Sequence, residues 1–231
     1  MLPEPEPVTP PVVFKPRKNA AQDKRLANDL TLAEQMLLAA LAEEEGADQL
    51  NEGGYTPEEI QVGLGKQRGA MLAFIGRQEA DARQIAATEA FNAADKASRT
   101  DYTRKRGFAK SAFMKDAAGW KALGLNGSEP KDQQDFITAV TALLEQGKNE
   151  QYALRLAKKG VTPVKLAELS KKIDDWKEAD QAQNNAIAAT IDATAKRDAA
   201  ARELYDWLAE YKQFARTQFK DQPAVAKRLL L

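Results

Sequence analysis

The feature that most constrains the fold of this chain is an internal repeat. A shift of 106 residues aligns the sequence with itself without a gap, from Ala20–Leu125 to Asn126–Leu231. Thr-Pro steps and phenylalanines match under this shift: Thr56-Pro57 with Thr162-Pro163, Phe108 with Phe214, and Phe113 with Phe219. Because the matches gather at helix starts and apolar positions, they predict two copies of one helical unit. The predicted organisation is therefore a first repeat over residues 20–125 and a second over residues 126–231.

Each repeat contains a long helical element that starts at a Thr-Pro pair. Thr56 and Thr162 are suited to the N-cap position, and the proline that follows each of them fits the first helical position. The apolar residues that follow recur mostly at three- and four-residue steps, close to the pattern of a coiled-coil seam. A single helix over this stretch would exceed about 50 residues. We expect either one long helix per repeat or a break near residues 76–82 and 180–186.

The composition favours helix over strand. Aromatic residues make up only 7% of the chain, while alanine, leucine, lysine, glutamate and glutamine are abundant. Each long element is amphipathic and needs a partner to cover its apolar face. We therefore predict an all-α fold, a four-helix-type bundle in which the two repeats of a tandem duplication pack about a pseudo-twofold axis. A solenoid stack of the repeats is the alternative.

Residues 1–19 differ in composition from the rest of the chain. They hold six prolines: Pro3, Pro5, Pro7, Pro10, Pro11 and Pro16. Proline fixes φ and lacks the amide donor, so this stretch is predicted to be an extended arm. The arm is either a tail or a strap on the bundle, or it is a proline-rich ligand for a partner domain.

The chain contains no histidine and no cysteine. Histidine-dependent triads, zinc hydrolases of the histidine type, Glu-x-x-His di-iron sites and disulfides are therefore excluded. Lysine plus arginine equals aspartate plus glutamate, at 34 each, so no global field attracts nucleic acid. We predict no catalytic residue, no cofactor, no metal site and no nucleic-acid partner.

The sequence also bears on location. No stretch approaches the ~18 consecutive apolar residues of a transmembrane helix. The acidic, proline-rich start lacks the basic and apolar regions of a signal peptide. A soluble protein in the cytoplasm follows by default.

Glycines recur near the start of the first long element. Gly63, Gly65 and Gly69, with Lys66 between them, superficially suggest a phosphate loop, but no strand precedes them and no Gly-Lys-Ser/Thr ending follows. We interpret Gly65, Gly69, Ala73 and Gly76 instead as a face of small residues where a neighbouring helix comes close. Runs of carboxylates such as Glu43-Glu44-Glu45 are interpreted as solvated surface, because adjacent side chains on a helix diverge.

A basic stretch lies near the end of the first repeat, with Tyr102 and Phe108 between the cations: Arg99, Arg104, Lys105, Arg106 and Lys110. This pattern suggests a patch that binds an acidic partner or a nucleic acid. The matched stretch of the second repeat carries both charge signs, so a solvated face balanced by acids of the next helix is the competing interpretation.

One motif recurs at the end of both repeats: Phe108-Ala109-Lys110-Ser111-Ala112-Phe113 with Leu123-Gly124-Leu125, and Phe214-Ala215-Arg216-Thr217-Gln218-Phe219 with Leu229-Leu230-Leu231. Together with the Gly-x-Thr-Pro helix start, it resembles uncharacterised bacterial proteins made of two such helical halves. The resemblance implies an all-helical fold for nearly the whole chain past the arm, and it supplies no activity and no catalytic residues. Leu230 departs from the glycine of the first copy.

Two functions compete at this level. The first is a non-enzymatic structural or protein-interaction bundle, which binds another protein or a second copy of itself as a homodimer. The alternative is an enzyme or small-molecule binder with a polar pocket between the repeats. That pocket is predicted near Asp180, Gln183 and Asn184, with Arg77 and Gln78 opposite.

Overall fold

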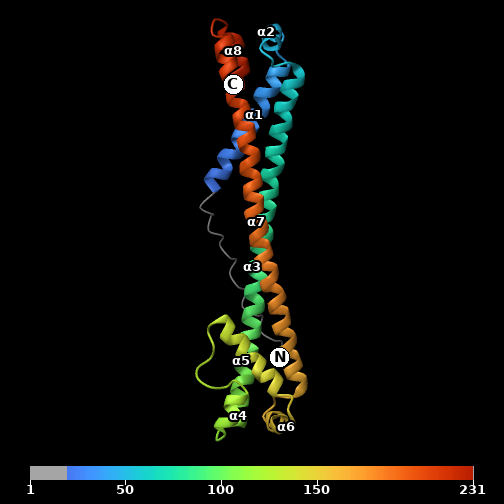
Figure 1. The fold of residues 1–231 in the computed structure, drawn as a ribbon, viewed down its shortest axis with the longest axis vertical. Helices are drawn as coiled ribbons and strands as arrows, with labels where there is room; N and C mark the ends of the chain where they lie inside the picture. The colour runs from blue at the N-terminus through green and yellow to red at the C-terminus, as the bar shows by residue number, and fades with distance from the viewer. Residues whose placement is uncertain (1–19, 231) are drawn as a thin grey trace, which may run out of the picture. The chain divides into compact units, whose positions relative to one another are not determined.

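The computed structural model describes residues 20–230, and within this range it contains helices and no β-strand. The helices are α1 (Ala20–Leu41), α2 (Ala47–Glu52), α3 (Pro57–Ala112), α4 (Ala117–Ala122), α5 (Gln133–Gln146), α6 (Glu150–Lys158), α7 (Pro163–Gln218) and α8 (Pro223–Leu230) (Figure 1). The all-α prediction is confirmed for these residues. The predicted arm, residues 1–19, lies outside the described range.

The two long helices begin and end alike. Both α3 and α7 contain 56 residues, start at a proline and run without a break at residues 76–82 or 180–186. Thr56 Oγ1 accepts a hydrogen bond from the amide of Glu59, and Thr162 Oγ1 accepts one from the amide of Lys165, both at 3.4 Å. These are the N-caps that the Thr-Pro pairs predict. A continuous helix is therefore the outcome for both long elements.

The chain divides into two compact units, and each unit combines residues of both predicted repeats. Within the described range, unit 1 comprises residues 20–77 and 193–230, and unit 2 comprises residues 78–192. Unit 1 contains α1, α2, α8, the first part of α3 and the last part of α7. Unit 2 contains α4, α5, α6 and the remaining parts of α3 and α7. The two long helices therefore contribute to both cores.

The core of unit 1 is formed by the apolar faces of α1, α3, α7 and α8. Its fully buried side chains include Leu30, Leu37, Leu204, Tyr211, Phe219 and Leu229. The α1 and α8 helices pack against each other. The rings of Trp207 and Tyr211 stack at 5.6 Å, and Tyr55 meets both edge-on. A Cβ atom at Gly63 would lie 2.7 Å from the Trp207 ring, so this glycine allows the indole to pack on α3.

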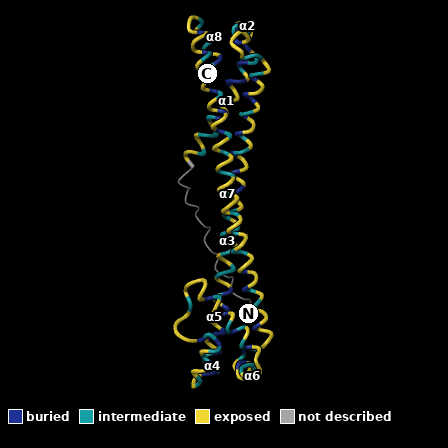
Figure 2. The backbone as a smooth tube through the Cα atoms, in the orientation of Figure 1, coloured by how far each residue is buried: buried dark blue, intermediate teal, exposed yellow. Residues whose placement is uncertain are grey.

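The core of unit 2 is formed by α3, α5, α6 and α7 with the segment after α4. Its fully buried side chains include Tyr102, Phe113, Leu123, Leu125, Phe136 and Leu169. Trp176 is also buried, and its indole Nε1 donates to Asp95 at 3.1 Å. In Figure 2 buried and exposed residues alternate along α3 and α7, as expected for helices that bury one stripe.

The phenylalanines of the repeated motif are not equally buried. Phe113 and Phe219 are fully buried in their units. Phe214 is half-buried, and its ring occupies the space beside Gly53, where a Cβ atom would lie 2.0 Å away. Phe108 is 45% exposed. The second phenylalanine of the motif, Phe113 or Phe219, is therefore a core residue in each repeat. The first phenylalanine is half-buried as Phe214 and exposed as Phe108.

The prediction of a close helix approach at the small-residue face is wrong for the described part of the chain. Added Cβ atoms at Gly65, Gly69 and Gly76 would meet no atom within 4 Å. The reason is helical phase: the buried positions of this part of α3 are Ile60, Gly63, Leu64, Gln67, Ala70 and Phe74. The three glycines fall on the other side of the helix and face outward.

Candidate functional site

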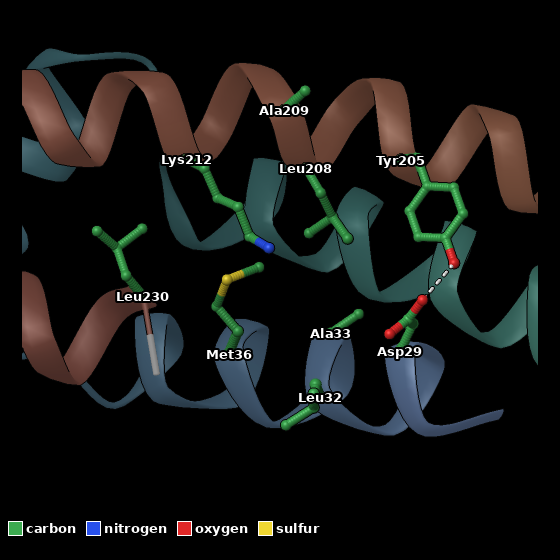
Figure 3. Close-up of a pocket in the computed structure, with 9 residues that line it drawn as sticks. All are labelled: Asp29, Leu32, Ala33, Met36, Tyr205, Leu208, Ala209, Lys212 and Leu230. Carbon is green, nitrogen blue, oxygen red and sulfur yellow. Dashed lines mark hydrogen bonds between the residues drawn. The ribbon is translucent and has the colours of Figure 1, made fainter. Parts of the chain in front are cut away.

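An open apolar groove lies between α1 and α7 in unit 1, beside the end of α8 (Figure 3). Its volume is about 370 Å³. Side chains one helical turn apart form its α1 wall: Asp29, Leu32, Ala33 and Met36. The facing wall on α7 has the same spacing: Tyr205, Leu208, Ala209 and Lys212. Leu230 of α8 lies at one end.

The groove exists because a small side chain occupies the middle of its α1 wall. Ala33 points toward α7 without filling the space between the helices, whereas the methyl group of Ala209 points away from α1 at the rim (Figure 3). Leu32, on the rim, is 54% exposed. An apolar hollow with an exposed leucine at its edge is typical of a surface that binds an apolar side chain of another segment.

The two ends of the groove are polar, and they differ. At one end Tyr205 Oη donates to Asp29 at 3.2 Å, and burial together with the Asp29 charge raises the pKa of Tyr205. At the other end Lys212 points toward the α1 wall (Figure 3). Among residues 20–230 no acceptor lies within hydrogen-bonding or ion-pair distance of its ammonium group. Lys212 is half-buried, so this unpaired cation lacks part of its hydration.

The matched position in unit 2 has the same kind of cation with its acceptors present. A shift of 106 residues places Lys212 on Arg106, which is 8% exposed. One guanidinium nitrogen of Arg106 lies 3.1, 3.3, 2.9 and 3.0 Å from the carbonyl oxygens of Leu125, Asn126, Gly127 and Ser128. These four residues belong to the linker between α4 and α5, so in unit 2 a peptide segment covers the cation that is matched to Lys212.

The linker lies directly on α5. A Cβ atom at Gly124 would be 3.0 Å from the Cβ of Ala142 and 3.1 Å from the carbonyl oxygen of Ala139. These alanines match Met36 and Ala33 of the groove. Leu125 is fully buried in the core of unit 2, whereas residues 126–129 are exposed. The linker thus buries two leucines, Leu123 and Leu125, and offers its backbone carbonyls to the cation.

The remaining linker contacts tie down its far end. Thr103 donates to the carboxylate of Glu129. Arg99 donates to the carbonyl oxygen of Pro130 at 3.1 Å, and its guanidinium lies 4.5 Å from the centre of the Phe136 ring. This face of unit 2 is therefore an example, within the same chain, of how a non-helical segment with turns at Gly124 and Gly127 packs on two such helices.

The five basic residues predicted as an interaction patch lie in different surroundings. Arg99 and Arg106 hold the linker, as described. Lys110 donates to the Gly127 carbonyl at 3.1 Å and lies over the Trp120 ring, and burial together with the Arg106 charge lowers the pKa of Lys110. Arg104 is the most exposed of the five, with 67% of its side chain accessible. A partner patch on this stretch stays a prediction.

Lys105, the fifth of these residues, belongs to a buried ion-pair network. Its ammonium group lies 2.6 Å from the carboxylate of Asp101, and both side chains are almost fully buried. Arg104 and Lys172 approach the same carboxylate at 2.9 and 3.3 Å. Burial alone would raise the pKa of Asp101, but the hydrogen bonds from Lys105 and Arg104 hold that pKa below its usual value.

Two of the residues predicted around a polar pocket have partners inside their own units. Arg77 lies 3.6 Å from Asp23 in unit 1. Gln183 donates to Thr88 at 3.3 Å in unit 2. Within residues 20–230, no group of acidic side chains is arranged to hold a metal ion. None of the helices in this range has the length and apolar character needed to cross a membrane.

Comparison with protein-family models, with curated proteins and with solved structures gives no match. The resemblance to helical proteins with two tandem halves therefore depends on the motifs of the sequence alone. Sequence reasoning also did not identify the groove of unit 1. The sequence did contain a signal for it. Lys212 and Arg106 are both basic at matched positions, and Ala33 and Ala139 are both small at matched positions.

Proposed function

We propose that this chain is a non-enzymatic protein-interaction protein, and that the groove of unit 1 binds a non-helical segment of another protein. One observation carries this proposal: Arg106 in unit 2 has four backbone carbonyls of a linker as acceptors, while the matched Lys212 in unit 1 faces an open groove. A peptide in the groove would supply the acceptors that Lys212 lacks.

The proposed occupant has the chemistry of the linker. It carries one leucine-type side chain for the hollow between Ala33, Met36 and Leu208. It continues with two or three residues of small or polar side chain, so that its backbone can approach the α7 wall and direct carbonyl or carboxylate oxygens at Lys212. Segments of a second copy of the chain are an alternative source that the experiment below separates.

We also infer that the two repeats are products of one tandem duplication with pseudo-twofold symmetry. The equal lengths of α3 and α7, and their bounds at the same 106-residue offset, support this. So do the left-handed glycines that precede both Thr-Pro pairs, Gly54 with φ of 86° and Gly160 with φ of 80°. The duplication explains why the linker of unit 2 resembles the segment that we propose for the groove of unit 1.

The test uses the linker as a free peptide. A fluorescently labelled peptide of residues 123–130 is titrated with the full chain, and its anisotropy is recorded. The wild-type protein is expected to bind it saturably. Ala209→Phe adds a ring to the α7 wall at the rim of the groove, where it narrows the entrance, and should weaken binding at least tenfold. Ala199→Phe makes the same change at an exposed alanine of α7 away from the groove, and it should bind like the wild type.

A second variant separates the apolar and polar contributions. Lys212→Met keeps an apolar stem in the groove and removes the charge, so we expect about tenfold weaker binding, the equivalent of about 1.4 kcal/mol. Equal binding by wild type and Ala209→Phe would contradict the proposed site. Sedimentation of the chain as a dimer that Ala209→Phe dissociates would instead identify a second copy as the occupant.

A further inference from the structure

A second hollow lies in unit 2, between the end of α5, the helix α6 and the start of α7. Its volume is about 530 Å³. Apolar side chains form much of its lining, among them Leu144, Pro163 and Leu166. Ala153 and Ala167 keep it wide. Pockets of 300–1,000 Å³ with a mainly apolar lining and a few polar groups are the usual sites of small molecules.

The hollow is a property of unit 2, because unit 1 has leucines at two matched positions. Gly147 matches Leu41, and Ser170 matches Leu64. Leu64 is 2% exposed and Leu41 packs against the same core, so these side chains fill unit 1. The hollow that remains beside Leu41 measures about 120 Å³. Burying a leucine contributes about 1.5–3 kcal/mol, and unit 2 lacks that contribution at Ser170.

The polar groups of the pocket are predominantly cationic. Lys148 of the α5–α6 turn and Lys171 of α7 line it, and neither has an ion-pair partner within residues 20–230. Asp174 also lines the pocket, but its carboxylate lies 4.0 Å from the ammonium group of Lys177. The hydroxyl of Ser170 adds a neutral donor. The pocket therefore combines an apolar interior with two lysines, neither in an ion pair within residues 20–230, and one aspartate at its edge.

We propose that this pocket binds a small apolar molecule with one acidic group, of the class of medium-chain carboxylic acids. The hydrocarbon part packs against Leu144 and Leu166, and the carboxylate is held by Lys148, Lys171 and the hydroxyl of Ser170. The site is separate from the peptide groove, since the groove is in unit 1 and every residue of this pocket is in unit 2. Binding of a small acid in this pocket therefore does not require that the groove of unit 1 binds a peptide.

The test is calorimetric titration of the full chain with decanoate below its micelle-forming concentration. The wild type is expected to bind one decanoate per chain. Ser170→Leu introduces the residue that unit 1 has at the matched position, and it should weaken binding at least tenfold while the helical circular dichroism is unchanged. Lys148→Gln with Lys171→Gln should weaken decanoate binding about tenfold and leave the binding of the neutral analogue decanol unchanged.

Ala209→Phe, which narrows the entrance of the peptide groove, is the matched control and should bind decanoate like the wild type. Absence of decanoate binding by the wild type would overturn the proposal. So would binding that Ala209→Phe abolishes and Ser170→Leu leaves intact, because the acid would then occupy unit 1. Binding to vesicles of anionic phospholipid without any binding of free decanoate would assign the lysines to a membrane surface and also overturn it.

Discussion

The α1–α7 groove of unit 1 and the α3–α5 face of unit 2 consist of matched positions, yet only in unit 2 does a described segment supply acceptors to the basic residue. Both have an alanine on the shorter helix, Ala33 or Ala139, and a basic residue on the long helix, Lys212 or Arg106. In unit 2 the segment from Leu125 to Ser128 covers these residues and gives Arg106 its acceptors. The difference teaches that this arrangement of two helices can hold a non-helical segment of the chain, and it motivates the proposal that the groove of unit 1 binds such a segment of another protein.

A second difference concerns the cores beneath these surfaces. In unit 1 the buried stripe of α7 contains Leu204 and Tyr211. The matched positions on α3 in unit 2 are Ser98 and Lys105, both almost fully buried. A buried ion pair contributes less stability than a well-packed apolar pair, because both charges lose their hydration. At these two positions unit 2 therefore depends on a polar side chain and a buried ion pair, whereas unit 1 depends on packing of largely apolar side chains.

The largest expected effect comes from breaking that ion pair. Asp101→Ala leaves the ammonium group of Lys105 buried without its carboxylate, and the free energy of unfolding should fall by about 3–5 kcal/mol. In unit 1 the position matched to Lys105 is Tyr211, and Tyr211→Phe removes a buried hydroxyl that has no hydrogen-bond partner within residues 20–230, so a change within about 0.5 kcal/mol is expected. Urea unfolding followed by circular dichroism measures both.

A double variant sharpens this contrast. Asp101→Leu with Lys105→Met replaces the pair by apolar side chains of similar length, and most of the lost stability should return. A double variant as unstable as Asp101→Ala would show that Arg104 and Lys172 carry the contribution of the network. Equal losses for Asp101→Ala and Tyr211→Phe would remove the distinction between the two cores.

The next effect concerns the linker. Arg106→Met removes hydrogen bonds from a charged donor to backbone carbonyls, and unit 2 should lose about 1.5–3 kcal/mol. Lys212→Met in unit 1 should stay within about 0.5 kcal/mol, because Lys212 has no such partners in the described part of the chain. Hydrogen exchange at residues 123–129 should accelerate only in Arg106→Met. Unchanged exchange there would mean that Leu125 alone holds the linker.

Acid should weaken both units through different carboxyls. In unit 1 the hydrogen bond from Arg228 at 2.9 Å holds the pKa of Glu43 below its usual value, and in unit 2 the pKa of Asp101 is lowered as well. A lowered folded-state pKa stabilises above the unfolded value, and this contribution is lost as pH falls through the folded value. Stability measured from pH 6 down to pH 3 should therefore fall.

Two variants attribute this acid response to the two units. Glu43→Gln and Asp101→Asn should each be less stable than the wild type at pH 6 and should show a shallower fall toward pH 3. Each variant removes one of the two titrating groups, so their effects on the slope should add. A wild-type slope retained in both variants would assign the acid sensitivity to other carboxyls.

The smallest effect should be the same in both units. Thr56→Ala and Thr162→Ala each remove one N-cap hydrogen bond at 3.4 Å, so each should cost about 0.5–1 kcal/mol. Thermal unfolding of the two single variants and the double variant measures this, and the two losses should add. A cost confined to one of the threonines would show that the matched helix starts are not energetically equivalent.

The parts of the fold that were predictable are those fixed by local chemistry. The Thr-Pro helix starts and the all-helical composition specify where α3 and α7 begin, because capping involves only neighbouring residues. The outward direction of Gly65, Gly69 and Gly76 was not predictable from their spacing, since three-to-four-residue steps define a face without saying which face is buried. The groove was not predictable either, because its openness depends on whether a distant segment covers it.

Methionine methyl NMR tests the peptide groove most directly. The chain has four methionines, and among those in the described range Met36 lines the groove while Met114, in unit 2, is 72% exposed. In protein labelled with ¹³C at the methionine methyl groups, the peptide of residues 123–130 should shift the Met36 signal saturably and leave the Met114 signal in place. A Met36 signal that stays unmoved at saturating peptide, or equal shifts of both signals, would contradict a peptide site between α1 and α7.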